Sequence, residues 1–118
     1  MAEGFRVRSR IWIEDEDGKV VFGAGRLRIL DAVAEYGSIL AAAHELRMSY
    51  RAVWGKIRAT EKRMGKPLVT SKAGGRSGGG SELTPLALSL VEKFNKLQSL
   101  TNAAADAVFR ELFGPESD

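Results

Sequence analysis

The sequence predicts a small α+β fold in which two β-hairpins accompany three short helices and one long helix. Three observations predict it: a period-two apolar pattern near the N-terminus, helical apolar spacing over residues 26–64, and an unbroken helical stripe over 85–113. The chain has 118 residues, of which 44% are hydrophobic, enough for one core. We therefore expect residues 1–118 to form a single domain.

The first hairpin is predicted over residues 5–22. Apolar and polar residues alternate from Phe5 to Ile13, as in a half-buried strand. Residues 14–18 form an acidic turn that ends in glycine, and residues 19–22 form a short return strand. Residues 23–25, Gly-Ala-Gly, should end the hairpin before the first helix.

Three helices are predicted within residues 26–64, at about 26–36, 38–46 and 50–64. Serine suits the first position before a helix, and glycine suits the left-handed position after one. The residues expected to begin or end these helices are Gly37, Ser38, Ser49 and Gly65. Two short helices joined by three residues, as in 38–64, are typical of a helix-turn-helix.

Residues 68–84 predict a second hairpin, in which two short strands flank a loop that is too rich in glycine for a helix or a strand interior. Thr84 and Pro85 then suit the start of a long helix, which we expect over residues 85–113. The apolar stripe of that helix is Leu86, Leu90, Phe94, Leu97, Leu100, Ala104, Ala107 and Leu112.

Basic residues are concentrated in the middle of the chain. Residues 47–76 contain nine basic residues and one acidic residue, Glu61, so this segment carries +8 while the whole chain carries +3. A local excess of this kind is expected of a surface that meets phosphates. A solvated basic face without a polyanion partner would show the same pattern.

Helical geometry divides the third helix into two faces. Val53, Ile57 and Met64 fall on one arc and should face the core. The opposite arc is basic and carries small residues, as a helix that enters the major groove requires. The residues of that arc are Arg51, Gly55, Arg58, Ala59 and Lys62. The alternative is an amphipathic helix that only packs by its apolar face.

The second hairpin follows this helix directly, so it is interpreted as a wing. Lys72 and Arg76 could reach phosphates beside the groove. A nucleotide-binding loop is a weaker interpretation, because the sequence contains no Gly-x-x-x-x-Gly-Lys-Ser/Thr segment. A flexible linker is the other alternative.

The long helix is too long to be buried against so small a body. A second copy could cover its apolar stripe and form a two-fold homodimer. The alternative is that the helix packs back over the first hairpin within one chain. The residues predicted to form the dimer contact are Leu90, Phe94, Leu97, Leu100 and Ala104.

Several segments together resemble a known family. The segments 25–30, 37–39 and 48–54, and above all the glycine-rich 72–80 with Leu83 and Thr84, are similar to the N-terminal DNA-binding domain of ModE-type molybdate-responsive regulators. A weaker likeness to LysR-type winged helices accompanies it. The family pattern commonly has glycine where this chain has Arg47, so we expect left-handed strain there.

This resemblance implies a winged helix-turn-helix that binds double-stranded DNA as a homodimer, with a link to molybdate or tungstate metabolism. It implies that Ser49, Tyr50 and Arg51 open the recognition helix, that Trp54 lies beside them, and that Arg76 lies at the tip of the wing. The residues that we expect to contact DNA are Ser49, Tyr50, Arg51, Trp54, Gly55, Lys56, Arg58, Lys72 and Arg76. Regulators of this family carry C-terminal oxyanion-binding domains; here a separate effector-sensing partner chain could supply that function.

Composition argues against an enzyme. The chain has no cysteine and one histidine, His44, so neither thiol catalysis nor a zinc site is expected, and no cofactor is. No apolar segment is long enough to span a membrane, and we expect the protein in the cytoplasm. The remaining alternative is a winged-helix interaction or architectural module that does not read DNA sequence.

Overall fold

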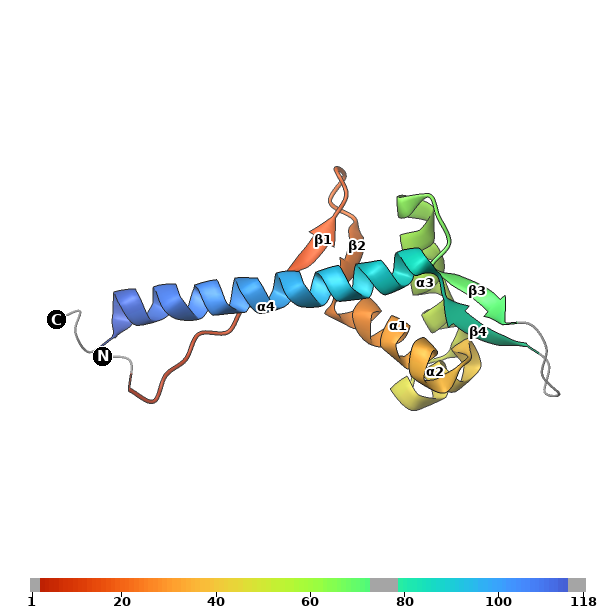
Figure 1. Cartoon of the computed structure of the whole chain (residues 1–118), viewed down its shortest axis with the longest axis horizontal. Helices are drawn as coiled ribbons and strands as arrows, with labels where there is room; N and C mark the ends of the chain where they lie inside the picture. The colour runs from red at the N-terminus through yellow and green to blue at the C-terminus, as the bar shows by residue number, and fades with distance from the viewer. Residues whose placement is uncertain (1–2, 73–78, 115–118) are drawn as a thin grey trace.

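A computed structural model describes residues 3–72 and 79–114 and confirms the predicted winged helix-turn-helix fold. Figure 1 shows α4 extending away from a compact head formed by the other elements. The molecule measures 66 Å along its longest axis and 31 and 23 Å across it. In chain order the elements are β1 (Trp12–Glu14), β2 (Val20–Gly23), α1 (Ala24–Tyr36), α2 (Ile39–Leu46), α3 (Tyr50–Met64), β3 (Val69–Lys72), β4 (Gly80–Leu83) and α4 (Pro85–Phe113).

The helix boundaries follow local capping chemistry. Ser38 Oγ accepts a hydrogen bond of 3.0 Å from the Ala41 N–H, and Ser49 Oγ accepts one of 3.0 Å from the Ala52 N–H. Thr84 Oγ1 caps α4 in the same way. Gly37 and Gly65 end α1 and α3 in the left-handed conformation, with φ of 79° and 74°. The predicted bounds of α3 and α4 are confirmed.

The start of α1 differs from the prediction. Residues 23–25 were expected to separate the hairpin from a helix that starts at about Arg26, but the helix begins at Ala24 and includes Gly25 in its first turn. Gly23 precedes it in an extended conformation and provides no side chain to cap it. The glycines are tolerated because the first turn is where a helix is least regular.

The core lies where α1, α2 and α3 meet β2 and the first turns of α4. Phe22 and Phe94 contact each other edge to face at its centre, with ring centroids 5.2 Å apart. Phe94 is therefore only 1% exposed, and its prediction as a dimer contact is wrong. The start of α4 lies over the head, so Phe94 is buried within one chain, and half-buried Leu90 packs against the same core.

The N-terminal strand is much shorter than predicted. Pairing is limited to β1 and β2, whereas residues 5–11 form no strand. This segment runs along the outer part of α4, where Ser9 Oγ donates a hydrogen bond of 2.7 Å to Asn102 Oδ1 (Figure 1). Phe5, expected to face inward, is 72% exposed. Alternation makes a segment able to form a strand, but no neighbouring strand lies beside it in the described chain.

The wing is an antiparallel pair in which Val69 lies opposite Leu83 and Lys72 opposite Gly80. Its second strand is joined to the end of α1 by the Ser81 N–H, which donates to the Gly37 carbonyl at 2.8 Å. A Cβ at position 80 would lie 2.8 Å from the same carbonyl, so glycine is required there. Arg76, predicted at the wing tip, lies outside the described residues.

Within residues 3–72 and 79–114, no helix combines the length and apolar character needed to cross a membrane.

Candidate nucleic-acid interface

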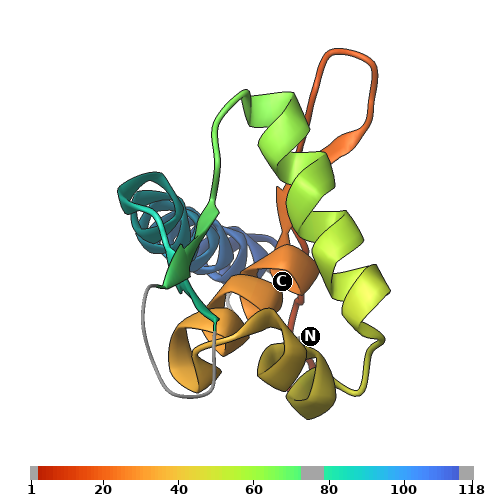
Figure 2. The same cartoon turned by 90° about the vertical axis from the view of Figure 1, so that its right-hand side faces the viewer.

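The connection between α2 and α3 sets the angle at which α3 leaves the head. Arg47 occupies the left-handed region with φ 57° and ψ 42°, confirming the strain predicted where glycine is common. The Met48 N–H donates to the Ala43 carbonyl at 2.9 Å, which closes the turn. Figure 2 shows α3 along one side of the head, with α1 and α2 beside it. One long face of α3 is thereby left open.

That open face is the basic face that helical geometry predicts from the sequence. Arg51, Gly55, Arg58 and Lys62 are all exposed, while Val53 and Ile57 are buried on the other side. A Cβ built at Gly55 meets no atom of the described chain within 4 Å. Glycine in a helix interior costs about 1 kcal/mol relative to alanine. Packing within the chain therefore does not explain Gly55, whereas close approach by another surface would.

Two aromatic residues border this face. Tyr50, in the first turn of α3, is 49% exposed. Trp54 is half-buried and packs against the core, and the Arg58 guanidinium lies 5.3 Å from the centre of its ring. This cation–π contact holds the Arg58 side chain along the helix surface. Ser49, which caps the helix, is exposed beside Tyr50.

Glu61, the single acidic residue of the basic segment, joins α3 to the wing. Its Oε2 accepts hydrogen bonds from the Leu68 and Val69 N–H groups at 2.8 and 3.3 Å. Its Oε1 lies 3.8 Å from Arg58 Nε. Glu61 thus holds the first wing strand at a defined position relative to the exposed face. The sequence analysis missed this role, because the glutamate was counted only as a charge.

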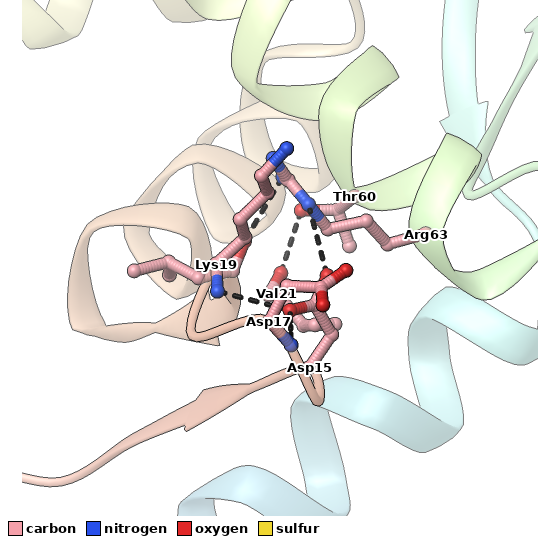
Figure 3. Close-up of polar contacts among 7 residues, drawn as sticks. Asp15, Asp17, Lys19, Val21, Thr60 and Arg63 are labelled. Atoms are coloured by element: carbon pink, nitrogen blue, oxygen red, sulfur yellow. Dashed lines mark hydrogen bonds and ion pairs between the residues drawn. The ribbon is translucent and has the colours of Figure 1, made fainter.

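Thr60 and Arg63 join α3 to the first hairpin (Figure 3). Thr60 is 1% exposed, and its Oγ1 donates a hydrogen bond of 2.7 Å to the Val21 carbonyl. Arg63 Nη1 donates to the Val20 carbonyl at 3.0 Å, and its Nε lies 3.7 Å from Asp15 Oδ2. Arg63 is therefore directed toward the hairpin and not the open face. Helical spacing already indicated that Thr60 is buried, because Thr60 falls on the same arc of the helix as Val53.

The hairpin turn is organised around the Asp15 carboxylate. Its Oδ1 accepts hydrogen bonds of 2.9 Å from the Lys19 and Asp17 N–H groups. These bonds, the one from Lys19 above all, lower the pKa of Asp15, and the Arg63 charge acts in the same direction. The acidic turn thus opposes part of the charge of α3 and fixes the hairpin against it.

The remaining predicted DNA contacts lie elsewhere. Lys56 is exposed on the flank of α3 that faces the start of α1, away from the open face. Lys72 is exposed at the end of β3. The predicted dimer contacts Leu97, Leu100 and Ala104 are exposed on the outer part of α4.

The fold and this surface define a helix-turn-helix DNA-binding domain with a wing. Residues 25–88 match the model of the "Bacterial regulatory helix-turn-helix protein, lysR family", and the chain belongs to that family. It is a family of transcriptional regulators and not of enzymes. Among residues 3–72 and 79–114, no three His, Asp or Glu side chains gather into a metal site.

Solved structures show the same fold. The chain is 27% identical to that of the CbnR DNA-binding domain in complex with DNA, with a TM-score of 0.53, covering 71% of this chain and 91% of that one. CbnR itself is described as a LysR family transcriptional regulator and gives 26% identity and a TM-score of 0.53, over 73% of this chain and 28% of CbnR.

Curated relatives agree with the resemblance to ModE-type regulators. The molybdenum-pterin-binding protein MopB of Rhodobacter capsulatus is 38% identical over 65% of this chain and 28% of its own length. The molybdenum transport protein ModE of Azotobacter vinelandii is 34% identical over 83% of this chain and 36% of its own. The chain thus spans about a third of the length of such relatives.

Proposed function

We propose that the chain is a sequence-specific regulator that binds double-stranded DNA through the open face of α3. The observation that carries the proposal is the open, basic face of α3 with an unobstructed glycine at its centre. Small residues allow a helix to approach the floor of the major groove, and arginines at its edge can donate to guanine. The similar CbnR domain was solved in complex with DNA, and this supports DNA binding by the present chain.

Base contacts are expected from the first turns of α3, and phosphate contacts from the flanks. Tyr50 and Arg51 lie where a recognition helix meets base edges. Ser49, Trp54, Gly55 and Arg58 complete that surface in the proposal. Lys72 and Arg76 of the wing are assigned to the phosphate backbone, which fixes register without reading sequence.

We propose that the protein acts as a homodimer through the outer part of α4. Leu97, Leu100 and Ala104 lie on one side of this helix, and Leu100 is 61% exposed. The N-terminal segment covers a different, polar side, where it contacts Asn102. A second copy of α4 would bury the apolar side and place two α3 helices about one DNA turn apart, on an inverted repeat.

Sedimentation of Leu100→Lys tests the dimer. A lysine at position 100 should convert the dimer to a monomer that keeps the helical content of the native chain. Ser99→Lys, which adds the same charge on the polar side of α4 that carries Asn102, should remain dimeric. A native chain that sediments as a monomer at all concentrations would contradict the dimer.

Selection of duplexes from a random library tests sequence reading. The expected result is enrichment of an inverted repeat with half-sites about one turn apart. Arg51→Ala should then cost about 1–3 kcal/mol at one base position, while Lys72→Ala should weaken all duplexes alike and lower the salt slope by about one. Lys93→Ala, on α4, is the charge-matched control. Binding without any enriched sequence would instead favour an interaction or architectural module.

The relatives extend the proposal to the regulated genes. Names such as "molybdenum transport protein ModE" support control of molybdate or tungstate metabolism. In this proposal a separate partner chain senses the effector. The protein would act in the cytoplasm, where bacterial DNA lies. A reporter driven by the selected operator should respond to added molybdate in cells and should not respond in a purified system that lacks the partner.

A further inference from the structure

A cavity of about 430 Å³ lies at the start of α1, between β1, the end of α2, the flank of α3 and the middle of α4. Four cationic side chains from three separate parts of the chain line it, while the described lining residues include no carboxylate. These side chains are Arg10, Arg26, Arg28 and Lys56. None of the four forms an ion pair within 4 Å in the described ranges 3–72 and 79–114.

Of the four cationic residues that line the cavity, Arg26 is the least exposed to solvent. Its Nε atom is buried and has no hydrogen-bond partner among the described residues. Burial lowers the pKa of the Arg26 guanidinium, and the nearby Arg63 charge lowers it further. A buried N–H of a charged group without an acceptor is unfavourable. An anion in the cavity would oppose the four like charges, among them the guanidinium charge of Arg26.

The backbone of the cavity also favours an anion. Ala24 and Gly25, in the first turn of α1, belong to its lining. The first N–H groups of a helix have no partner within the helix, and no side chain of the described residues caps α1. The helix dipole places partial positive charge at the same point. Backbone donors and cations therefore converge on one space.

We propose that this cavity is a binding site for a phosphate-type oxyanion, supplied either by the DNA backbone or by a free anion. Fork-shaped arginines and helix N–H groups are the donors that recognise tetrahedral oxyanions. Lys56 connects the cavity to α3, so a backbone phosphate held here would lie beside the groove that α3 enters. Only the assignment of the anion to the DNA backbone rests on the proposed function. Binding of an anion in the cavity does not depend on it.

The test is a titration of the full, ¹⁵N-labelled chain with sodium phosphate at pH 7, at ionic strength held constant with sodium chloride. The amide signals of residues 24–26 should shift and saturate. Arg28→Gln and Lys56→Gln, both exposed residues whose loss should not unfold the chain, should each weaken phosphate binding about three- to tenfold. Lys93→Gln, which removes one charge on α4 away from the cavity, should leave binding unchanged.

Amide shifts that fail to saturate, or an equal loss in Lys93→Gln, would overturn the proposal. Repeating the titration with a duplex bound identifies the source. If the duplex displaces phosphate and Arg28→Gln lowers the salt slope of DNA binding by about one, the occupant is a backbone phosphate. If phosphate and duplex bind together and the slope is unchanged, the site takes a free oxyanion. A chain that bound no duplex would refute the proposed function, while the titration without DNA would still decide the site.

Discussion

The hydroxyl of Thr60 on α3 donates a hydrogen bond of 2.7 Å to the carbonyl of Val21 on β2, in a region where Thr60 is almost fully buried. The two residues lie 39 positions apart in the sequence. This bond fixes the helix that carries the candidate interface against the hairpin that precedes α1. The position of α3 thus depends on a polar contact in the core as well as on apolar packing.

Thr60→Val should lower the free energy of unfolding by about 1–3 kcal/mol, because it keeps the side-chain shape but leaves the Val21 carbonyl without its donor. Urea denaturation measures the change. The control is Thr101→Val on α4, where the hydroxyl donates to the Leu97 carbonyl of its own helix at an exposed position. If both variants lost the same small amount, the buried bond would have no special role.

Gly55→Ala should separate stability from DNA binding. The added methyl group meets open space in the described chain, so the free energy of unfolding should rise by about 0.5–1 kcal/mol. DNA affinity should fall, because the methyl group occupies the space that the groove needs. Thermal unfolding and fluorescence anisotropy with a duplex measure the two effects. A more stable variant with unchanged affinity would place the DNA on another face.

Glu61→Ala should loosen the base of the wing. The substitution removes the carboxylate that accepts from the Leu68 and Val69 N–H groups, and we expect a loss of about 1–2 kcal/mol. Hydrogen exchange should show faster exchange at amides 68 and 69, while the amides of α2 stay protected. Exchange is the better readout here, because removing a negative charge also favours DNA binding by itself. Unchanged protection at 68 and 69 would contradict the assignment.

Asp15 should make stability depend on pH in the acidic range. Its pKa is lower in the folded chain than the ordinary value of about 3.9, so its stabilising effect is present above that value. The effect is lost as the pH falls through the lowered pKa, because protonation removes the negative charge that strengthens the hydrogen bond from the Lys19 N–H and attracts Arg63. The native chain and Asp15→Asn should therefore differ in melting temperature at pH 7, and the difference should shrink as the pH falls below the ordinary carboxyl value and through the lowered pKa.

The control for this prediction is Asp17→Asn. It removes the same charge from the same turn but leaves the two hydrogen bonds of the Asp15 carboxylate in place. Its melting temperature at pH 7 should change less than that of Asp15→Asn. Equal changes would indicate that only net charge matters in this turn.

The sequence by itself determined the helices and the exposed face of α3. Ser38, Ser49 and Thr84 accept from N–H groups three residues ahead, and Gly37 and Gly65 adopt left-handed conformations where each helix ends. These are local interactions, so short sequence patterns predict them. Helical periodicity likewise separated Val53 and Ile57 from Arg51 and Gly55, because a helix repeats regularly.

Only the tertiary structure decided which predicted strands are paired and which apolar residues are buried. Residues 5–11 alternate as a strand does, yet they lie along α4 because pairing requires a second strand that no local pattern supplies. Phe94 is part of a stripe that also includes Leu100, but the head covers only the start of α4, so one is buried and the other exposed. The cationic cavity at α1 is lined by residues as far apart in the sequence as Arg10 and Lys56. Such convergence depends on how the elements pack and not on periodicity.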